Sequence, residues 1–199
     1  MKNVIKNSKK GILMVTMFAA SLSFAKETSF FTIKNDVKKT ALTLKNVKAG
    51  NLLSIIDDNG VILYKEIIQK TGIYSKGFDL TAFTDGAYLF ELNKDLEIIT
   101  IPFSVKSNTV IFNKEKGKTI FKPYFKVKED VLYISKLTLN ETPLTVAIYY
   151  VNSGESELKY SETVENTMDY KKAFKLTGLE EGSYKVIVTS EDRTYVKNI

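Results

Sequence analysis

Residues 79–92 read Asp-Leu-Thr-Ala-Phe-Thr-Asp-Gly-Ala-Tyr-Leu-Phe-Glu-Leu, and residues 175–188 read Lys-Leu-Thr-Gly-Leu-Glu-Glu-Gly-Ser-Tyr-Lys-Val-Ile-Val. Identical residues in these stretches lie 96 positions apart, among them Leu80 and Leu176, Gly86 and Gly182, and Tyr88 and Tyr184. Each stretch predicts a short strand, a tight turn that ends in glycine, and a second strand. We interpret the two copies as the same position in two successive β-sandwich domains.

The strand predicted after each glycine alternates in polarity. Successive side chains of a strand point to opposite faces of its sheet, so Tyr88, Phe90 and Leu92 are expected to share one face. The residues between them are mixed in polarity, a pattern typical of a half-buried strand in an antiparallel sheet.

Five residues are expected to have structural roles. Gly86 and Gly182 are predicted at turns that need either a positive φ or a close approach of the backbone. Gly60 ends an Asn-Gly turn between two β-branched runs, which is a strong signal for a hairpin. Tyr88 and Tyr184 are predicted to anchor the core as tyrosine corners, with each hydroxyl bonded to nearby backbone.

The N-terminus has the pattern of a secretory signal peptide. Residues 1–10 carry four lysines and no acid, an apolar run follows, and Ser23-Phe24-Ala25 supplies small residues for cleavage before Lys26. A membrane anchor is the alternative, but the run of about 15 residues is shorter than the roughly 20 that a spanning helix needs. Removing residues 1–25 leaves 25 of the 29 basic residues against 23 acidic ones, a net charge of +2 instead of +6. A charge this small does not favour nucleic acid or an anionic membrane as a partner.

The composition excludes most catalytic chemistry. The chain has no Cys and no His, so thiolate nucleophiles, the usual triads and zinc sites are absent. We therefore predict no catalytic residue, no metal and no cofactor, and that the protein is not an enzyme. Residues 57–59 offer hard oxygens for calcium, but the twelfth position of such a loop is Ile68 and not Glu.

Turn signals every 8 to 12 residues and the lack of a helical period predict an all-β fold. We expect two tandem immunoglobulin-like antiparallel β-sandwich domains after the N-terminal signal peptide. Their predicted bounds are 26–106 and 107–199, after a signal peptide at 1–25.

One stretch interleaves basic and aromatic residues, and we consider it a possible interaction surface. Its candidate residues are Lys118, Phe121, Lys122, Tyr124 and Lys126. Such a pattern can bind single-stranded nucleic acid by stacking and charge, an anionic envelope surface or an acidic glycan. Equally, the lysines can protect an edge strand while the aromatic rings pack in the core.

The turn and core positions also resemble a known family. They follow the pattern Leu42-x-Leu44, Gly50-x-Leu52, Ile55-x-Asp57-x-Asn59-Gly60 and Asp79-Leu80 with Gly86-x-Tyr88. This pattern resembles the C-terminal sorting domain of type IX secretion systems, and also fibronectin-III-like and other immunoglobulin-like modules of envelope proteins. The resemblance covers residues 37–105 and, more weakly, 137–198. It implies a small exported bacterial envelope protein, located in the periplasm, on the cell surface or outside the cell.

The sequence therefore predicts a non-enzymatic exported protein that acts as a structural or protein-interaction module of the bacterial envelope. A glycan-binding accessory module and a sorting domain for type IX secretion are the alternatives. The expected partners are another envelope protein or a cell-wall component, with no nucleic acid and no transmembrane anchor.

Overall fold

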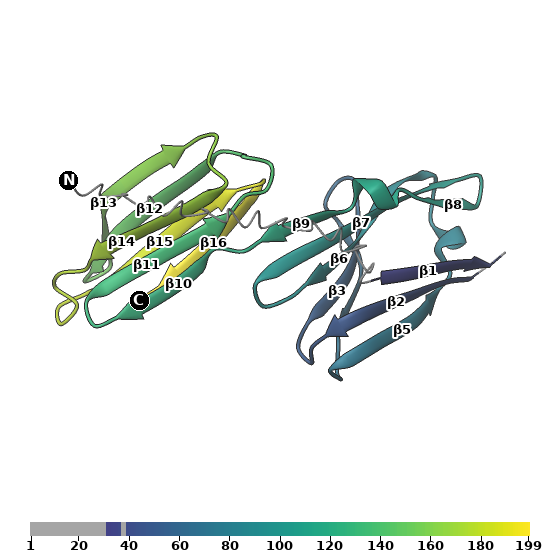
Figure 1. Ribbon diagram of the computed structural model, residues 1–199, viewed down its shortest axis with the longest axis horizontal. Helices are drawn as coiled ribbons and strands as arrows, with labels where there is room; N and C mark the ends of the chain where they lie inside the picture. The colour runs from purple at the N-terminus through teal and green to yellow at the C-terminus, as the bar shows by residue number, and fades with distance from the viewer. Residues whose placement is uncertain (1–30, 37–38) are drawn as a thin grey trace, which may run out of the picture.

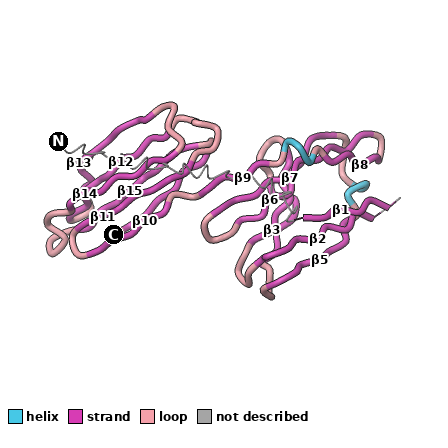
Figure 2. Tube along the Cα trace, viewed as in Figure 1, coloured by secondary structure: helices cyan, strands magenta, loops and turns pink. Residues whose placement is uncertain are grey.

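A computed structural model describes residues 31–36 and 39–199. The predicted signal peptide and its cleavage site before Lys26 lie outside the described residues. Strands dominate the described chain, and its two helices are single 3₁₀ turns (Figure 2). Neither is long and apolar enough to cross a membrane.

The elements of the described residues follow one another in this order: β1 (Phe31–Asp36), β2 (Lys39–Val47), β3 (Leu52–Asp57), β4 (Ile62–Ile67), β5 (Gly72–Phe78), η1 (Leu80–Ala82), β6 (Gly86–Asn93), β7 (Glu97–Lys106), β8 (Thr109–Phe112), η2 (Lys114–Lys116), β9 (Lys118–Phe121), β10 (Tyr124–Lys128), β11 (Val131–Leu137), β12 (Leu144–Asn152), β13 (Glu155–Val164), β14 (Asp169–Lys175), β15 (Ser183–Ser190) and β16 (Arg193–Asn198).

The first sandwich is formed by β1 to β9. A three-stranded sheet, in the order β1-β2-β5, faces a larger sheet in the order β4-β3-β6-β7-β8, and β9 also pairs with β7. All of these pairings are antiparallel. Leu42, Leu53 and Phe90 come from both sheets and are almost fully buried between them. The alternation of buried and exposed residues along β2 shows why this sequence forms a strand with one face in the core.

The second sandwich repeats this arrangement with β10 to β16. Its sheets run β10-β11-β14 and β13-β12-β15-β16, so each strand from β10 to β16 takes the place of its counterpart from β1 to β7. Leu132, Val146 and Val186 are buried between these sheets. Two antiparallel sheets packed face to face in this order form an immunoglobulin-like sandwich, and the predicted fold class is confirmed.

The repeated tyrosines lie in equivalent places. Tyr88 is 7% exposed, and its hydroxyl donates to the carbonyl oxygen of Thr84 at 2.7 Å. Tyr184 is 6% exposed, and its hydroxyl donates to the carbonyl oxygen of Thr177 at 2.9 Å. Each ring therefore fills its core while its hydroxyl bonds the chain that leads into the same strand.

The two reasons expected for the repeated glycines were a positive φ and a close approach of the backbone. Gly60 has a φ of +81° in the β3–β4 turn, but neither Gly86 nor Gly182 has a positive φ. The reason for glycine at Gly182 is close approach, because a Cβ there would lie 2.7 Å from the carbonyl oxygen of Val151. At Gly86 the nearest atom to such a Cβ would be 3.4 Å away, which is ordinary contact.

Replacing Gly182 by alanine is expected to lower the free energy of unfolding by about 1–3 kcal/mol, because backbone must move to admit the methyl group. The matched change Gly86→Ala should cost under about 1 kcal/mol, since its site has room. Urea denaturation of both variants measures the difference. Equal losses would contradict the packing argument.

The chain crosses between the sandwiches in two residues. Because β8 and β9 pair with β7, residues 109–121 belong to the larger sheet of the first sandwich. The sequence places the same residues in the second predicted domain, 107–199, and these domain bounds stay a prediction. Lys122 and Pro123 separate β9 from β10, and Figure 1 shows β9 leading from one sandwich to the other.

Two side chains tie this junction. The ammonium group of Lys122 donates to Asn93 Oδ1 at 2.6 Å and to the carbonyl oxygen of Lys94 at 2.5 Å. Arg193, from the second sandwich, donates to Glu91 Oε2 of the first at 2.5 Å. The two bonds of Lys122 hold the connecting segment to the first sandwich, and the bond of Arg193 joins the second sandwich to the first.

Candidate functional site

An exposed surface of tyrosines and lysines covers the outer side of the sheet β10-β11-β14. We call it the tyrosine–lysine face and define it by Tyr124, Lys126, Tyr133, Ser135, Lys171 and Ala173. The side chains that alternate with them, among them Phe125 and Leu132, pack toward the core. The strand period of two therefore separates the core of the second sandwich from this face.

The register of the strands places these side chains in two rows. Tyr124 is opposite Ser135, which is opposite Lys171. In the next row, Lys126 is opposite Tyr133, which is opposite Ala173.

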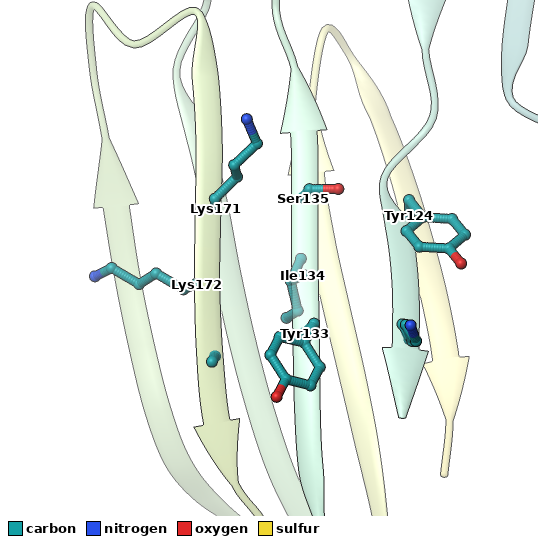
Figure 3. A pocket seen from close by; sticks show the side chains of 8 residues that line it. Tyr124, Tyr133, Ile134, Ser135, Lys171 and Lys172 are labelled. Carbon is teal, nitrogen blue, oxygen red and sulfur yellow. The ribbon is translucent and has the colours of Figure 1, made fainter. Parts of the chain in front are cut away.

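These rows border an open hollow of about 440 Å³ on the surface of the sheet. The side chains of Ser135 and Ala173 are small and leave space between the larger ones. Tyr124 and Tyr133 are 52% and 45% exposed, and Figure 3 shows their rings standing on neighbouring strands beside the hollow. The hollow is therefore a shallow depression with aromatic walls.

The lysines on and beside this face differ in whether a carboxylate neutralises them. Lys171 is paired with Asp169 at 2.5 Å, and at the far end of the sheet Lys175 is paired with Asp130 at 3.5 Å. In the part of the chain that the structure describes, Lys126 makes no ion pair. Its charge is thus available to an acidic ligand.

The structure brings together only two of the five candidate interaction residues, Tyr124 and Lys126. Lys118 and Phe121 are in β9 and pair with β7 of the first sandwich. Lys122 is held at the junction, where burial lowers the pKa of its ammonium group despite the nearby carboxylates of Asp95 and Glu91. The stretch is split because the chain passes from one sandwich to the other at residues 122–123.

Sequence reasoning missed Tyr133 and Lys171, which come from β11 and β14. Both are outward-facing residues of the second sandwich. The outward period of β11, with Tyr133 and Ser135 between buried Leu132 and Ile134, is the signal that could have found the first of them.

A second cluster of polar side chains joins β4 to β5 in the first sandwich. Lys76 Nζ donates to Glu66 Oε2 and to the Tyr64 hydroxyl, both at 2.6 Å, and the Tyr74 hydroxyl donates to Glu66 Oε2 at 3.0 Å. The Tyr64 hydroxyl also bonds Glu66. The hydrogen bonds from Lys76 and then Tyr64 lower the pKa of Glu66 from its usual 4.5 to about 2.

The same cluster recurs in the second sandwich, displaced by the offset of 96 residues. Its four members are Tyr160, Glu162, Tyr170 and Lys172, which match Tyr64, Glu66, Tyr74 and Lys76. Lys172 Nζ donates to Glu162 Oε2 at 2.5 Å and to the Tyr160 hydroxyl at 3.0 Å. Figure 3 shows Lys172 directed away from the hollow of the tyrosine–lysine face.

We call each of these clusters a sheet clasp, because it joins the two sheets of its sandwich where they lack hydrogen bonds to each other. β4 and β5 are edge strands of different sheets, and so are β13 and β14. In the second clasp, burial alone would raise the pKa of Glu162, but its hydrogen bond from Lys172 and the nearby tyrosine hydroxyls outweigh this effect and lower it. The offset found at Leu80, Gly86 and Tyr88 relates the four residues of one clasp to those of the other, but it does not show that they are in contact.

The first clasp predicts a pH dependence of stability. Because the folded pKa of Glu66 is below its unfolded value, its contribution is complete above about pH 4.5 and is lost as the pH falls toward 2. The urea midpoint of Glu66→Gln should therefore change less than that of the unaltered protein between pH 5 and pH 2. Glu115→Gln, at the exposed Glu115, is the control and should behave as the unaltered protein. Equal pH profiles for Glu66→Gln and the unaltered protein would contradict the proposed role of the clasp.

The acidic turn of residues 57–59 is a hairpin. Asp57 Oδ1 accepts the backbone N–H of Asn59 at 3.0 Å and that of Val61 at 2.8 Å, and these bonds close the turn. Among the described residues, no group of three or more acidic side chains is arranged to hold a metal ion. A cleft of about 800 Å³ does pass beside this turn, between the two sandwiches, with Glu91 and Arg193 in its lining.

No family model and no curated protein matches this chain. Among solved structures, the BSP domain of a biofilm-associated protein matches with 14% identity and a TM-score of 0.28, covering 81% of this chain and 26% of that one. The chain therefore spans about a quarter of that protein's length. A two-domain fibronectin type III segment from chicken tenascin matches with 12% identity and a TM-score of 0.28, covering 85% and 96%. The CupB2 chaperone of Pseudomonas aeruginosa matches with 10% identity and a TM-score of 0.24, covering 81% and 91%.

Proposed function

We propose that this protein is a non-enzymatic, exported interaction module of the bacterial envelope, and that the tyrosine–lysine face is its binding surface. The observation that carries the proposal is the pair of exposed tyrosines, Tyr124 and Tyr133, beside Lys126 over one hollow. Its partner is a cell-wall component or another envelope protein.

The physical reason is that exposed aromatic rings on a rigid sheet bind at a low entropic cost. A tyrosine side chain has few rotatable bonds and presents a large contact area. The backbones of β10, β11 and β14 are held in an antiparallel ladder, so the rings keep their spacing before a ligand arrives. Lysines beside the rings add attraction for an acidic partner.

The test is sedimentation of the purified protein with an isolated bacterial envelope fraction. The double variant Tyr133→Ala/Lys126→Gln should lose most of its sedimentation. The control Tyr149→Ala/Lys185→Gln removes a tyrosine and a lysine that are opposite each other on the other sheet of the same sandwich. The control should sediment as the unaltered protein does, and loss in both variants, or in neither, would contradict the proposed surface.

The absence of catalysis is also part of the proposal, and it rests on the lack of Cys and His in the sequence. A panel of hydrolase substrates should show no turnover by the purified protein. Turnover that a single carboxylate substitution abolishes would overturn the non-enzymatic role.

Sorting by a type IX secretion system, implied by the sequence resemblance, makes the opposite prediction about export. Deleting residues 124–199 removes the second sandwich and keeps β8 and β9 with their partner β7. Under our proposal the shortened protein is still exported. Retention inside the cell would favour the sorting role.

A further inference from the structure

From the same face we infer a ligand class: the hollow between Tyr124 and Tyr133 binds an acidic polysaccharide, with sugar rings on the tyrosines and carboxylates at the lysines. This inference rests on the proposed function, since it names the kind of envelope component that the tyrosine–lysine face takes.

The spacing of the two rings suits a chain of flat units. Tyr124 is opposite Ser135, and Tyr133 is two residues from Ser135 on the same strand, so the tyrosines are diagonal neighbours on adjacent strands. Side chains in this relation have Cα atoms roughly 7–8 Å apart. The small side chains of Ser135 and Ala173 keep the space beside the rings open, so a sugar can lie against either ring.

Each tyrosine has a lysine in its own row. Lys126 is directly opposite Tyr133, and Lys171 is in the row of Tyr124 with Ser135 between them. A polymer with a carboxylate on each sugar can therefore meet a ring and an ammonium group at successive positions. A neutral polysaccharide would leave Lys126 without a counter-charge and gain only the contacts with the rings, whereas Lys171 already has Asp169 as its partner.

The composition of the face argues against a protein partner. Stable protein interfaces bury about 1,200–2,000 Å² and are depleted of lysine in their cores, whereas here Lys126 and Lys171 line the hollow itself. A peptide strand added to the sheet would have to pair with one of its edge strands, either β10, which carries Lys126 and Lys128, or β14, which carries Lys171 and Lys175. Lysines on an edge strand oppose such pairing.

The test compares three polymers by isothermal titration calorimetry: polygalacturonate, neutral dextran and polyglutamate. We expect binding to polygalacturonate that weakens as salt is added and at least about tenfold weaker binding to the other two. Tyr124→Ala/Tyr133→Ala should weaken polygalacturonate binding by at least about tenfold, as for central anchors of a binding surface. Lys126→Gln should reduce both the affinity and its salt dependence.

Two controls separate a failure of this inference from a failure of the proposed function. Tyr149→Ala/Lys185→Gln should bind polygalacturonate as the unaltered protein does, and circular dichroism should show that every variant is folded. Equal affinity for polyglutamate, with no loss in the double tyrosine variant, would overturn the polysaccharide and leave an acidic protein as the partner of the face. No binding to any polymer would overturn the inference, while the envelope sedimentation experiment would still decide the proposed function.

Discussion

Replacing Tyr88 by alanine is expected to lower the free energy of unfolding of the first sandwich by about 3–5 kcal/mol, as for other large aromatic truncations in cores. The ring is 7% exposed and stacks on Phe103 with centroids 5.4 Å apart. Removing it opens a cavity beside that ring and also deletes the hydrogen bond to Thr84. Tyr184→Ala should destabilise the second sandwich by a similar amount, because Tyr184 is equally buried and packs against Tyr150.

Hydrogen exchange followed by mass spectrometry can assign each loss to its sandwich in the intact protein. The matched variant Tyr88→Phe keeps the ring and removes only the hydroxyl, so it should cost about 1 kcal/mol. If Tyr88→Ala cost under about 1 kcal/mol, the view of Tyr88 as a core anchor would be wrong.

Glu191→Ala is the second change with a large expected effect, a loss of about 3–5 kcal/mol from the second sandwich. The side chain of Lys136 is fully buried, and its ammonium group donates to Glu191 Oε2 at 2.6 Å and to the carbonyl oxygen of Leu137 at 3.0 Å. Removing Glu191 would leave a buried positive charge without its counter-ion. Urea denaturation measures the loss.

The control for this pair removes the charge as well as its partner. Lys136→Met/Glu191→Ala should recover most of the lost stability, because methionine fills the space of the lysine stem without a charge to compensate. If the double variant were as unstable as Glu191→Ala alone, the cost would come from lost packing at Glu191, and the buried charge would not be its cause.

Patterns that depend on neighbours in the sequence predicted the fold well. Alternation of side chains around Phe90 and the Asn-Gly turn at Gly60 are local properties, and they predicted strands and a hairpin that the structure contains. Expectations that depend on packing were less accurate. Gly182 was expected to need a positive φ or a close approach, and only the position of Val151 in the folded chain shows that the second is the reason.

At the candidate site, too, residues that are close in sequence were predicted together, and packing decided which of them share a surface. The interleaved lysines and aromatics from Lys118 to Lys126 are close in sequence, but strand pairing divides them between two sandwiches. Lys118 and Phe121 are in β9, which pairs with β7. Tyr124 and Lys126 share a sheet face with Tyr133 and with residues of β14. The sheet clasps were missed because their members, such as Glu66 and Lys76, are ten residues apart and meet only when two sheets pack together.

The sequence by itself determined the all-β class, the repeated sandwich and the anchoring tyrosines, because each follows from the period of two along a strand and from an offset of 96 residues. Only the tertiary structure decided which side chains share a surface. A face of a sheet is assembled from strands distant in the chain, and the alternation within one strand does not show which other strands become its neighbours.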